Sequence, residues 1–394
     1  MKNALKIIFV LLFQLAVLEN GHAETGISAN LFYSYDSNTF RNYLNYSDRI
    51  GQGTLYLSHD FGGNADLFRV YYQGNYYNFN NFVDRNFLYH QAGIAYSHEM
   101  ADPGNVIYAG AKFANRLNKE LYNYYNFNQF IAYTNARFKL GSSFLQGGYR
   151  LRERTYQNLE GFSYWEHMLF LRFNRSFETR TSVTIESNFG FKNYVARTYV
   201  TTVYDSSFMG GRGGRMGGRG IRTIISVEDA PSAKLLVSSF RLAQSITTNT
   251  GLSLEVLYRY NFDSEARTLA TIESGYMTED ELFDDPYSYK GLQYTAKITQ
   301  LLPRGIQTAI SFTLTNKFYP GHLALDLEGN PVDGQYRSDQ LRYFYAGLEK
   351  SFALKHLFAS LTFYLDSYWI KNSSNDDYYR YTRSLFSGGM TVNF

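Results

Sequence analysis

Residues 144–154 place arginines at alternate positions, an arrangement that can attract anions. The polar residues of one parity are Gln146, Arg150, Arg152 and Arg154, and the other parity holds Leu145, Gly147, Tyr149 and Leu151. Because side chains alternate across a strand, the arginines would form a basic ladder on one face. Such a ladder favours anions at a constriction. The alternative is that carboxylates on the same face neutralise it, and the candidates are Glu166, Glu186 and Glu255.

Residues 209–222, with the sequence MGGRGGRMGGRGIR, hold four arginines, seven glycines and no acidic residue. The arginines are Arg212, Arg215, Arg219 and Arg222. Such a segment is flexible and cationic, which suits contact with anionic lipopolysaccharide or a surface glycan. The alternative is a solvated loop without a ligand. An RNA-binding role would fit a cytoplasmic protein, whereas the export signal described below argues against any nucleic acid.

Residues 263–286 are acidic, with eight Asp and Glu residues against Arg267 alone. Their densest part holds Glu279, Asp280, Glu281, Asp284 and Asp285. Because exposed opposite charges attract each other weakly and are screened by salt, we expect this cluster to pair with 209–222 as a loose, salt-sensitive lid and not as a rigid plug. Carboxylates also bind divalent cations, but the spacing of an EF-hand is absent, so no metal is expected.

Catalytic chemistry finds little support in the sequence. No Ser-His-acid set is recognisable, and there is no phosphate-binding loop or cluster of transition-metal ligands. His167 is expected to point outward from its strand, beside Trp165 and Leu169. We therefore predict no enzymatic activity and no cofactor. The hexapeptide NYYNFN occurs at Asn75–Asn80 and Asn123–Asn128, and it fits either sugar contacts or an interfacial aromatic girdle.

The elements that must carry these residues are strands. Apolar and polar residues alternate in successive segments, as in 252–262, where Glu255 and Arg259 share the polar face. We count 16 such segments: 25–35, 52–59, 67–77, 87–99, 106–115, 128–140, 144–154, 164–175, 181–198, 234–247, 252–262, 287–301, 306–318, 340–352, 357–370 and 379–394.

The connections alternate between long and short. Long ones are predicted at 36–51, 78–86, 116–127, 155–163, 199–233, 263–286, 319–339 and 371–378, and short turns such as 141–143 and 302–305 lie between them. A β-sandwich or a β-helix does not predict this pattern, whereas an antiparallel up-and-down transmembrane barrel does. Arginines then belong in the wet lumen, because facing lipid costs them about 2–4 kcal/mol each near the midplane. The predicted pore-lining residues are Gln146, Arg150, Arg152, Arg154, Glu186, Glu255 and Arg259.

Both ends of the chain agree with export to an outer membrane. Lys2 and Lys6 precede an apolar run at 7–18, and small residues at 21–23 complete a cleavable signal peptide over 1–23. Residues 24–394 are then a single barrel domain. The last strand alternates Phe386, Met390, Val392 and the terminal Phe394 with polar residues.

This terminal strand resembles that of Gram-negative outer-membrane β-barrel proteins, where a final aromatic serves as the assembly signal. The resemblance implies insertion by the barrel-assembly machinery, with both termini on the periplasmic side. Aromatic residues make up 18% of the chain, as interfacial girdles require, and it contains no cysteine.

The function expected from about 16 strands is a porin-like channel, because barrels of this size enclose an aqueous lumen. It would pass small hydrophilic solutes by diffusion through a membrane bearing lipopolysaccharide. The alternatives are an export or surface-assembly barrel for polysaccharide or protein, and a surface adhesion or receptor protein. The net charge of +3 names no partner, and the sequence leaves the solute and the oligomeric state open.

Overall fold

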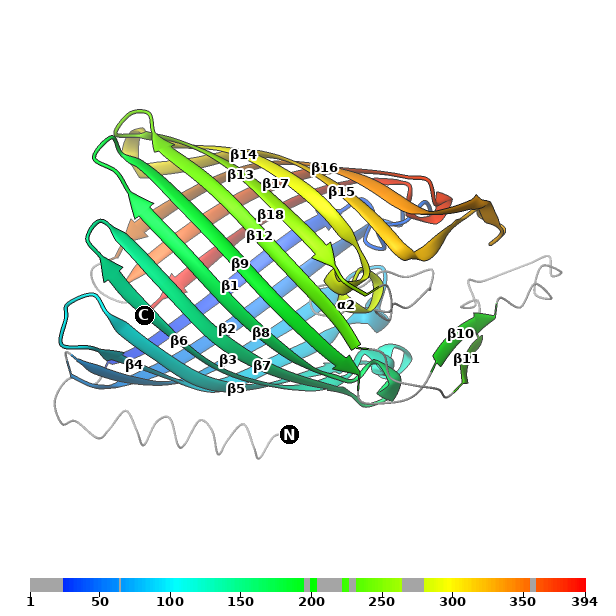
Figure 1. The fold of residues 1–394 in the computed structure, drawn as a ribbon, viewed down its shortest axis with the longest axis horizontal. Helices are drawn as coiled ribbons and strands as arrows, with labels where there is room; N and C mark the ends of the chain where they lie inside the picture. The colour runs from blue at the N-terminus through cyan, green and yellow to red at the C-terminus, as the bar shows by residue number, and fades with distance from the viewer. Residues whose placement is uncertain are drawn as a thin grey trace.

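The computed structural model describes residues 24–63, 65–194, 199–203, 222–226, 232–263, 280–354 and 359–394. The predicted signal peptide at 1–23 lies outside this range. Sixteen antiparallel strands close into one barrel, and β10 and β11 form a separate two-stranded sheet (Figure 1). The predicted number of barrel strands and the all-β class are therefore confirmed. Among the described residues, no helix is long and apolar enough to cross a membrane.

Most strands span 12–15 residues. Their bounds are β1 (Glu24–Asp36), β2 (Asp48–Gly62), β3 (Asp66–Phe79), β4 (Phe87–Glu99), β5 (Val106–Asn118), β6 (Phe127–Leu140), β7 (Ser143–Tyr156), β8 (Tyr164–Ser176), β9 (Thr181–Tyr194), β10 (Tyr199–Val203), β11 (Arg222–Ser226), β12 (Ser232–Ser245), β13 (Thr250–Asn261), β14 (Lys290–Leu302), β15 (Ile306–Leu325), β16 (Pro331–Ala353), β17 (Ser360–Ser374) and β18 (Tyr381–Asn393). The short helices are η1 (Val83–Arg85), η2 (Glu120–Tyr125), η3 (Glu160–Phe162), α2 (Asp280–Phe283), η6 (Pro286–Ser288), η7 (Pro303–Gly305) and η8 (Asp377–Tyr379).

The two-residue period of the sequence separates the faces of the wall. Large apolar side chains point outward and stay exposed, as Leu31, Leu169 and Leu365 do at 56%, 56% and 61%. Residues of the other parity face inward and include most of the charged side chains. β1 pairs with β18, so the barrel closes and has no edge strand. Closure thereby avoids the unpaired backbone groups that an open edge would expose.

The seventh long connection differs from prediction. Residues 319–325 and 331–339 were expected in a loop, whereas they extend the hairpin of β15 and β16, which run for 20 and 23 residues. The register shifts between Phe318 and Leu323. Such an irregularity lets Pro320, which lacks an amide hydrogen, sit inside a strand.

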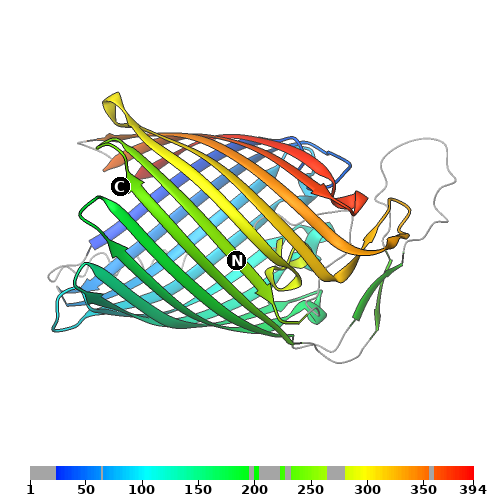
Figure 2. The same ribbon diagram turned by 45° about the horizontal axis from the view of Figure 1, so that its top comes forward.

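An aromatic cluster fills part of the lumen at the end of the barrel with the long connections. Its members include Tyr77, Phe79, Phe87, Tyr125, Phe127 and Tyr156. Both copies of NYYNFN contribute their third and fifth residues, Tyr77 and Phe79 from one, Tyr125 and Phe127 from the other, each at most 3% exposed. These rings thus form an internal packing surface, and α2 lies beside it within the barrel (Figure 2).

Candidate functional site

The basic ladder of β7 lies on the inner face of the barrel. Its exposure falls toward the end with the long connections: the side chain of Arg150 is 38% exposed, that of Arg152 13% and that of Arg154 4%. Gln146, at the other end of the ladder, donates to Asn135 Oδ1 at 2.9 Å. The predicted residues therefore share one face, with only Arg150 well open to solvent.

Glu166 on the neighbouring strand β8 neutralises part of the ladder. Arg150 Nη2 lies 3.3 Å from Glu166 Oε2, and Arg152 Nη2 donates to Oε1 at 3.0 Å. Glu186, another predicted partner, pairs instead with Arg172 at 2.6 Å. Glu255, on β13, lies directly opposite Arg241 of the neighbouring strand β12. Of the three candidate carboxylates, Glu166 is the one that contacts the ladder.

The second carboxylate at the ladder comes from the acidic connection between β13 and β14. Glu281 Oε1 accepts from Arg152 Nη1 at 2.7 Å, and its Oε2 accepts from Arg154 Nη1 at 3.3 Å and Tyr164 OH at 2.6 Å. Residues 281–289 thus fold into the lumen and dock on the wall; we call them the acidic insertion.

Asp285 anchors the next turn of the acidic insertion to β9. Its Oδ2 accepts from Lys192 Nζ at 2.6 Å and from Tyr194 OH at 3.3 Å, while Oδ1 accepts from the Tyr287 amide at 2.9 Å. Tyr287 OH in turn donates to Glu166 Oε1 at 2.9 Å. One network therefore joins the ladder, Glu166 and both turns of the insertion.

Asp284 reaches a different part of the wall. It accepts hydrogen bonds from Lys317 Nζ and from Tyr319 OH, the latter at 2.8 Å, both on β15. Arg259, which was predicted to line the pore, lies over the ring of Tyr289 at 4.8 Å. The insertion is consequently held from β7 to β15, a large part of the barrel circumference.

Apolar contacts complete the docking. Leu282 and Phe283 are 2% and 6% exposed and pack into the aromatic cluster. Phe283 meets Tyr125 edge to face, with centroids 5.9 Å apart. Burial of these two side chains contributes roughly 1.5–3 kcal/mol each.

The charges of the insertion are set by burial and by its cationic neighbours. Burial opposes ionisation of Glu281, but Arg152, Arg154 and Lys192 outweigh it and hold its pKa well below the usual range. Burial also opposes ionisation of Asp284, and Lys317 with Arg337 lowers its pKa nonetheless. Burial, together with the charge of Glu281, raises the pKa of Asp285. The neighbouring cations therefore favour the ionised forms of Glu281 and Asp284.

The expected lid is wrong for three of its acidic residues. Glu281, Asp284 and Asp285 contact the inner wall instead, where largely buried lysine and arginine side chains pair with them. Their carboxylates are already paired with cations, which leaves them poorly suited to a divalent ion. The structure does not describe four further residues of the predicted lid, Arg212, Arg215, Arg219 and Glu279, nor the side chains of two more, Arg222 and Asp280.

The terminal strand faces as the alternation predicts. Phe386, Met390 and Phe394 point outward, 45%, 36% and 52% exposed, and Val392 shares their parity. The Phe394 amide donates to Ile27 O at 2.9 Å, so the last residue still joins β1. His167 also lies among the outward side chains, where its Nδ1 is 2.6 Å from Tyr149 OH.

Lys192, Lys317, Tyr164 and Tyr287 were not identified as site residues from the sequence. Lys192 and Lys317 stand on the polar parity of their strands, which was the available signal for the two cations. Tyr287 is preceded by Leu282 and Phe283, two apolar residues within an acidic stretch, and that interruption indicates a buried turn. Nothing distinguishes Tyr164 among 37 tyrosines.

Comparison with protein families finds no match, and no curated protein sequence matches the chain. Among solved structures, the chain is similar to a bacterial polysaccharide outer membrane secretin at 9% identity, covering 93% of this chain and 98% of that one, with a TM-score of 0.49. OccAB1 of Acinetobacter baumannii is 10% identical, over 94% and 96%, with a TM-score of 0.49. OpdQ of Pseudomonas aeruginosa is 9% identical, over 95% and 99%, also at 0.49. Likeness at this level does not carry a function from one barrel to another.

Proposed function

We propose that this protein is an outer-membrane channel through which small hydrophilic solutes diffuse. The observation that carries the proposal is a closed barrel of 16 strands with apolar side chains outside and charged ones inside. An apolar exterior belongs in lipid, and a polar interior of this diameter belongs around water. In this proposal 1–23 is the export signal, the barrel-assembly machinery inserts the chain, and both termini face the periplasm.

The acidic insertion is the constriction of this channel. It covers the wall from β7 to β15 and narrows the lumen at the end with the long connections. Within its central network four cations, Arg150, Arg152, Arg154 and Lys192, face three carboxylates, Glu166, Glu281 and Asp285. The surplus cation, with Arg150 the most exposed, favours weak anion selectivity.

Conductance of the purified, refolded protein in planar bilayers tests the proposal. We expect discrete channel openings and a reversal potential in a salt gradient that indicates a modest preference for anions. Heat-modifiable migration on gels provides the control that the barrel is folded. A folded barrel that gives no current above that of the lipid alone would contradict the channel and favour an adhesion role.

A further inference from the structure

The hydrogen bonds and ion pairs of the acidic insertion are confined to one part of the inner wall. Within the described residues, its hydrogen bonds and ion pairs reach β7, β8, β9, β13 and β15, and none reaches β17, β18 or β1. On that remaining wall, β16, β17, β18, β1 and β2 border a cavity of about 240 Å³. If the lumen conducts, solutes within it have access to this cavity.

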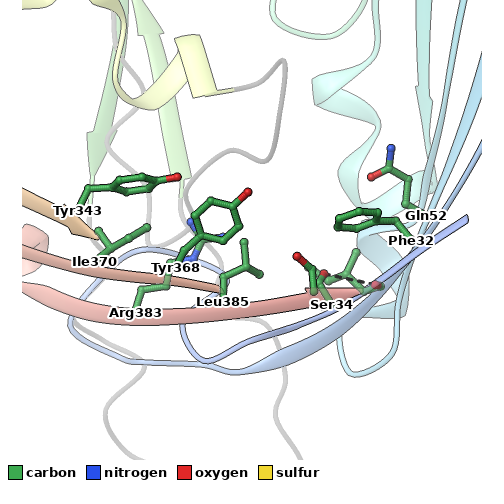
Figure 3. A pocket seen from close by; sticks show the side chains of 10 residues that line it. Phe32, Ser34, Gln52, Tyr343, Tyr368, Ile370, Arg383 and Leu385 are labelled. Carbon is green, nitrogen blue, oxygen red and sulfur yellow. Dashed lines mark hydrogen bonds between the residues drawn. The ribbon is translucent and has the colours of Figure 1, made fainter. Parts of the chain in front are cut away.

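Aromatic rings and neutral polar groups line this cavity. Figure 3 shows the rings of Tyr343 and Tyr368 on one side, with both hydroxyls directed into the open space, and Phe32 and Gln52 across from them. The rings of Tyr343 and Tyr368 lie 5.7 Å apart, at 48°. Flat apolar faces thus alternate with groups that donate and accept hydrogen bonds.

A buried hydroxyl at the cavity has no partner. Ser387 is 8% exposed, lines the cavity, and its Oγ makes no hydrogen bond with any residue that the structure describes. Leaving a buried hydroxyl unpaired costs roughly 1–3 kcal/mol. The wall closes this hydroxyl off from solvent, so the polar groups that a ligand in the cavity can reach are Gln52 and the two tyrosine hydroxyls.

The cavity offers no free charge. Its one charged lining residue, Arg383, donates from Nε and Nη2 to the two oxygens of Asp36 at 2.8 and 2.6 Å, and the two side chains are 7% and 0% exposed. Because a buried guanidinium already held by two hydrogen bonds gains little from a second anion, the site does not select a carboxylate or a phosphate.

We propose that this cavity, which we name the tyrosine site, binds neutral carbohydrate, one sugar ring at a time. A sugar ring has an apolar face that packs on tyrosine and a rim of hydroxyls that matches Gln52 and the two phenols. The volume is below the roughly 300–1,000 Å³ of sites for drug-sized ligands, which suits a single ring. This inference rests on the proposed channel and assigns its solute class.

Uptake into proteoliposomes tests it, with glucose as the neutral probe and glucuronate as its charged counterpart. We expect saturable glucose flux and non-saturable glucuronate flux in the parent protein. Tyr368→Ala should raise the half-saturating glucose concentration about tenfold, whereas Tyr368→Phe, which keeps the ring, should raise it about threefold or less. Tyr56→Ala is the matched control, because Tyr56 is an inward tyrosine of β2 that does not line the cavity. It should leave the half-saturating glucose concentration unchanged.

Conductance measured on the same preparations separates the two ideas. A channel that conducts ions but shows glucose flux that is non-saturable, or is insensitive to Tyr368→Ala, overturns the tyrosine site and leaves the channel in place. Saturation by glucuronate at concentrations equal to or lower than those for glucose also overturns the neutral class. A folded barrel that passes neither ions nor sugar refutes the channel itself.

Discussion

Replacing Glu281 by glutamine should loosen the acidic insertion and widen the channel. Glu281 is the point where the insertion meets the ladder, through Arg152 at 2.7 Å and Arg154 at 3.3 Å. Glutamine preserves the shape of the side chain and removes its charge. Arg152 keeps Glu166 and Arg154 keeps Gln129 as partners, so the wall itself should stay folded.

The size of the effect follows from the burial of the pair. Removing one partner of a buried ion pair costs about 3–5 kcal/mol. Glu281 retains 23% exposure, so we take the lower figure, about 3 kcal/mol. That amount multiplies the undocked population about 160-fold, and an undocked fraction of about 0.1% would rise to about 14%.

Single-channel recording provides the assay. The parent should show rare openings to a high-conductance level, and Glu281→Gln should occupy that level for a substantial share of the time. Glu255→Gln removes the same charge from the inner face of β13 and leaves the insertion untouched, so it should behave like the parent. If Glu281→Gln and the parent share one distribution of conductance levels, the insertion is either not held by this carboxylate or not in the conducting path.

Three further outcomes are expected. Arg150→Glu should move the reversal potential toward cation selectivity, because Arg150 is the most exposed cation of the ladder; an unchanged potential would place it off the path. Acid should release the insertion. The pKa values of Glu281 and Asp284 are lowered when docked, so both carboxylates stabilise docking above the usual carboxyl range, and this stabilisation is lost as the pH falls through the lowered pKa values. The raised pKa of Asp285 acts in the opposite direction but is one group against two, so conductance should hold from pH 7 to 5 and rise below about pH 4. Deleting Phe394 should sharply reduce the heat-modifiable, membrane-inserted form in cells, and wild-type amounts of folded barrel would count against an assembly role.

The strands were predictable because a single physical rule generates them. Where one face of a strand meets an apolar medium and the other meets water, the two-residue period is written directly into the sequence. The inward direction of Arg150, Arg152 and Arg154 follows from the same rule, as does the contact of Arg150 and Arg152 with Glu166 on the adjacent strand. The rule failed at 319–339, which was predicted as a long connection, whereas the strands continue there through an irregular register.

The acidic insertion was not predictable in the same way. Arg152 and Glu281 are 129 residues apart, and no local period relates a connection to the wall it will fold against. Charge alone pointed to the wrong partner, since the arginine-rich segment at 209–222 is the nearest basic stretch in sequence. The relevant property is burial: Arg152, Arg154 and Lys192 are largely buried in the wall, and a charge-assisted hydrogen bond to a buried cation is stronger than one between exposed groups.

The seam between β1 and β18 has a consequence for how this chain folds. The hydrogen bond from Asn30 to Thr391 spans 361 residues, whereas every other interface of the barrel joins strands that are consecutive along the chain, apart from β9 and β12, between which the separate sheet of β10 and β11 intervenes. The entropy of closing a loop of that length amounts to about 5 kcal/mol, so hairpins can zip together sequentially while the seam waits for the final strand. Until then the sheet has two open edges, each able to pair with another chain. Closure of the barrel therefore competes kinetically with aggregation. A chain shortened at its carboxyl end should aggregate and should not persist as a smaller barrel.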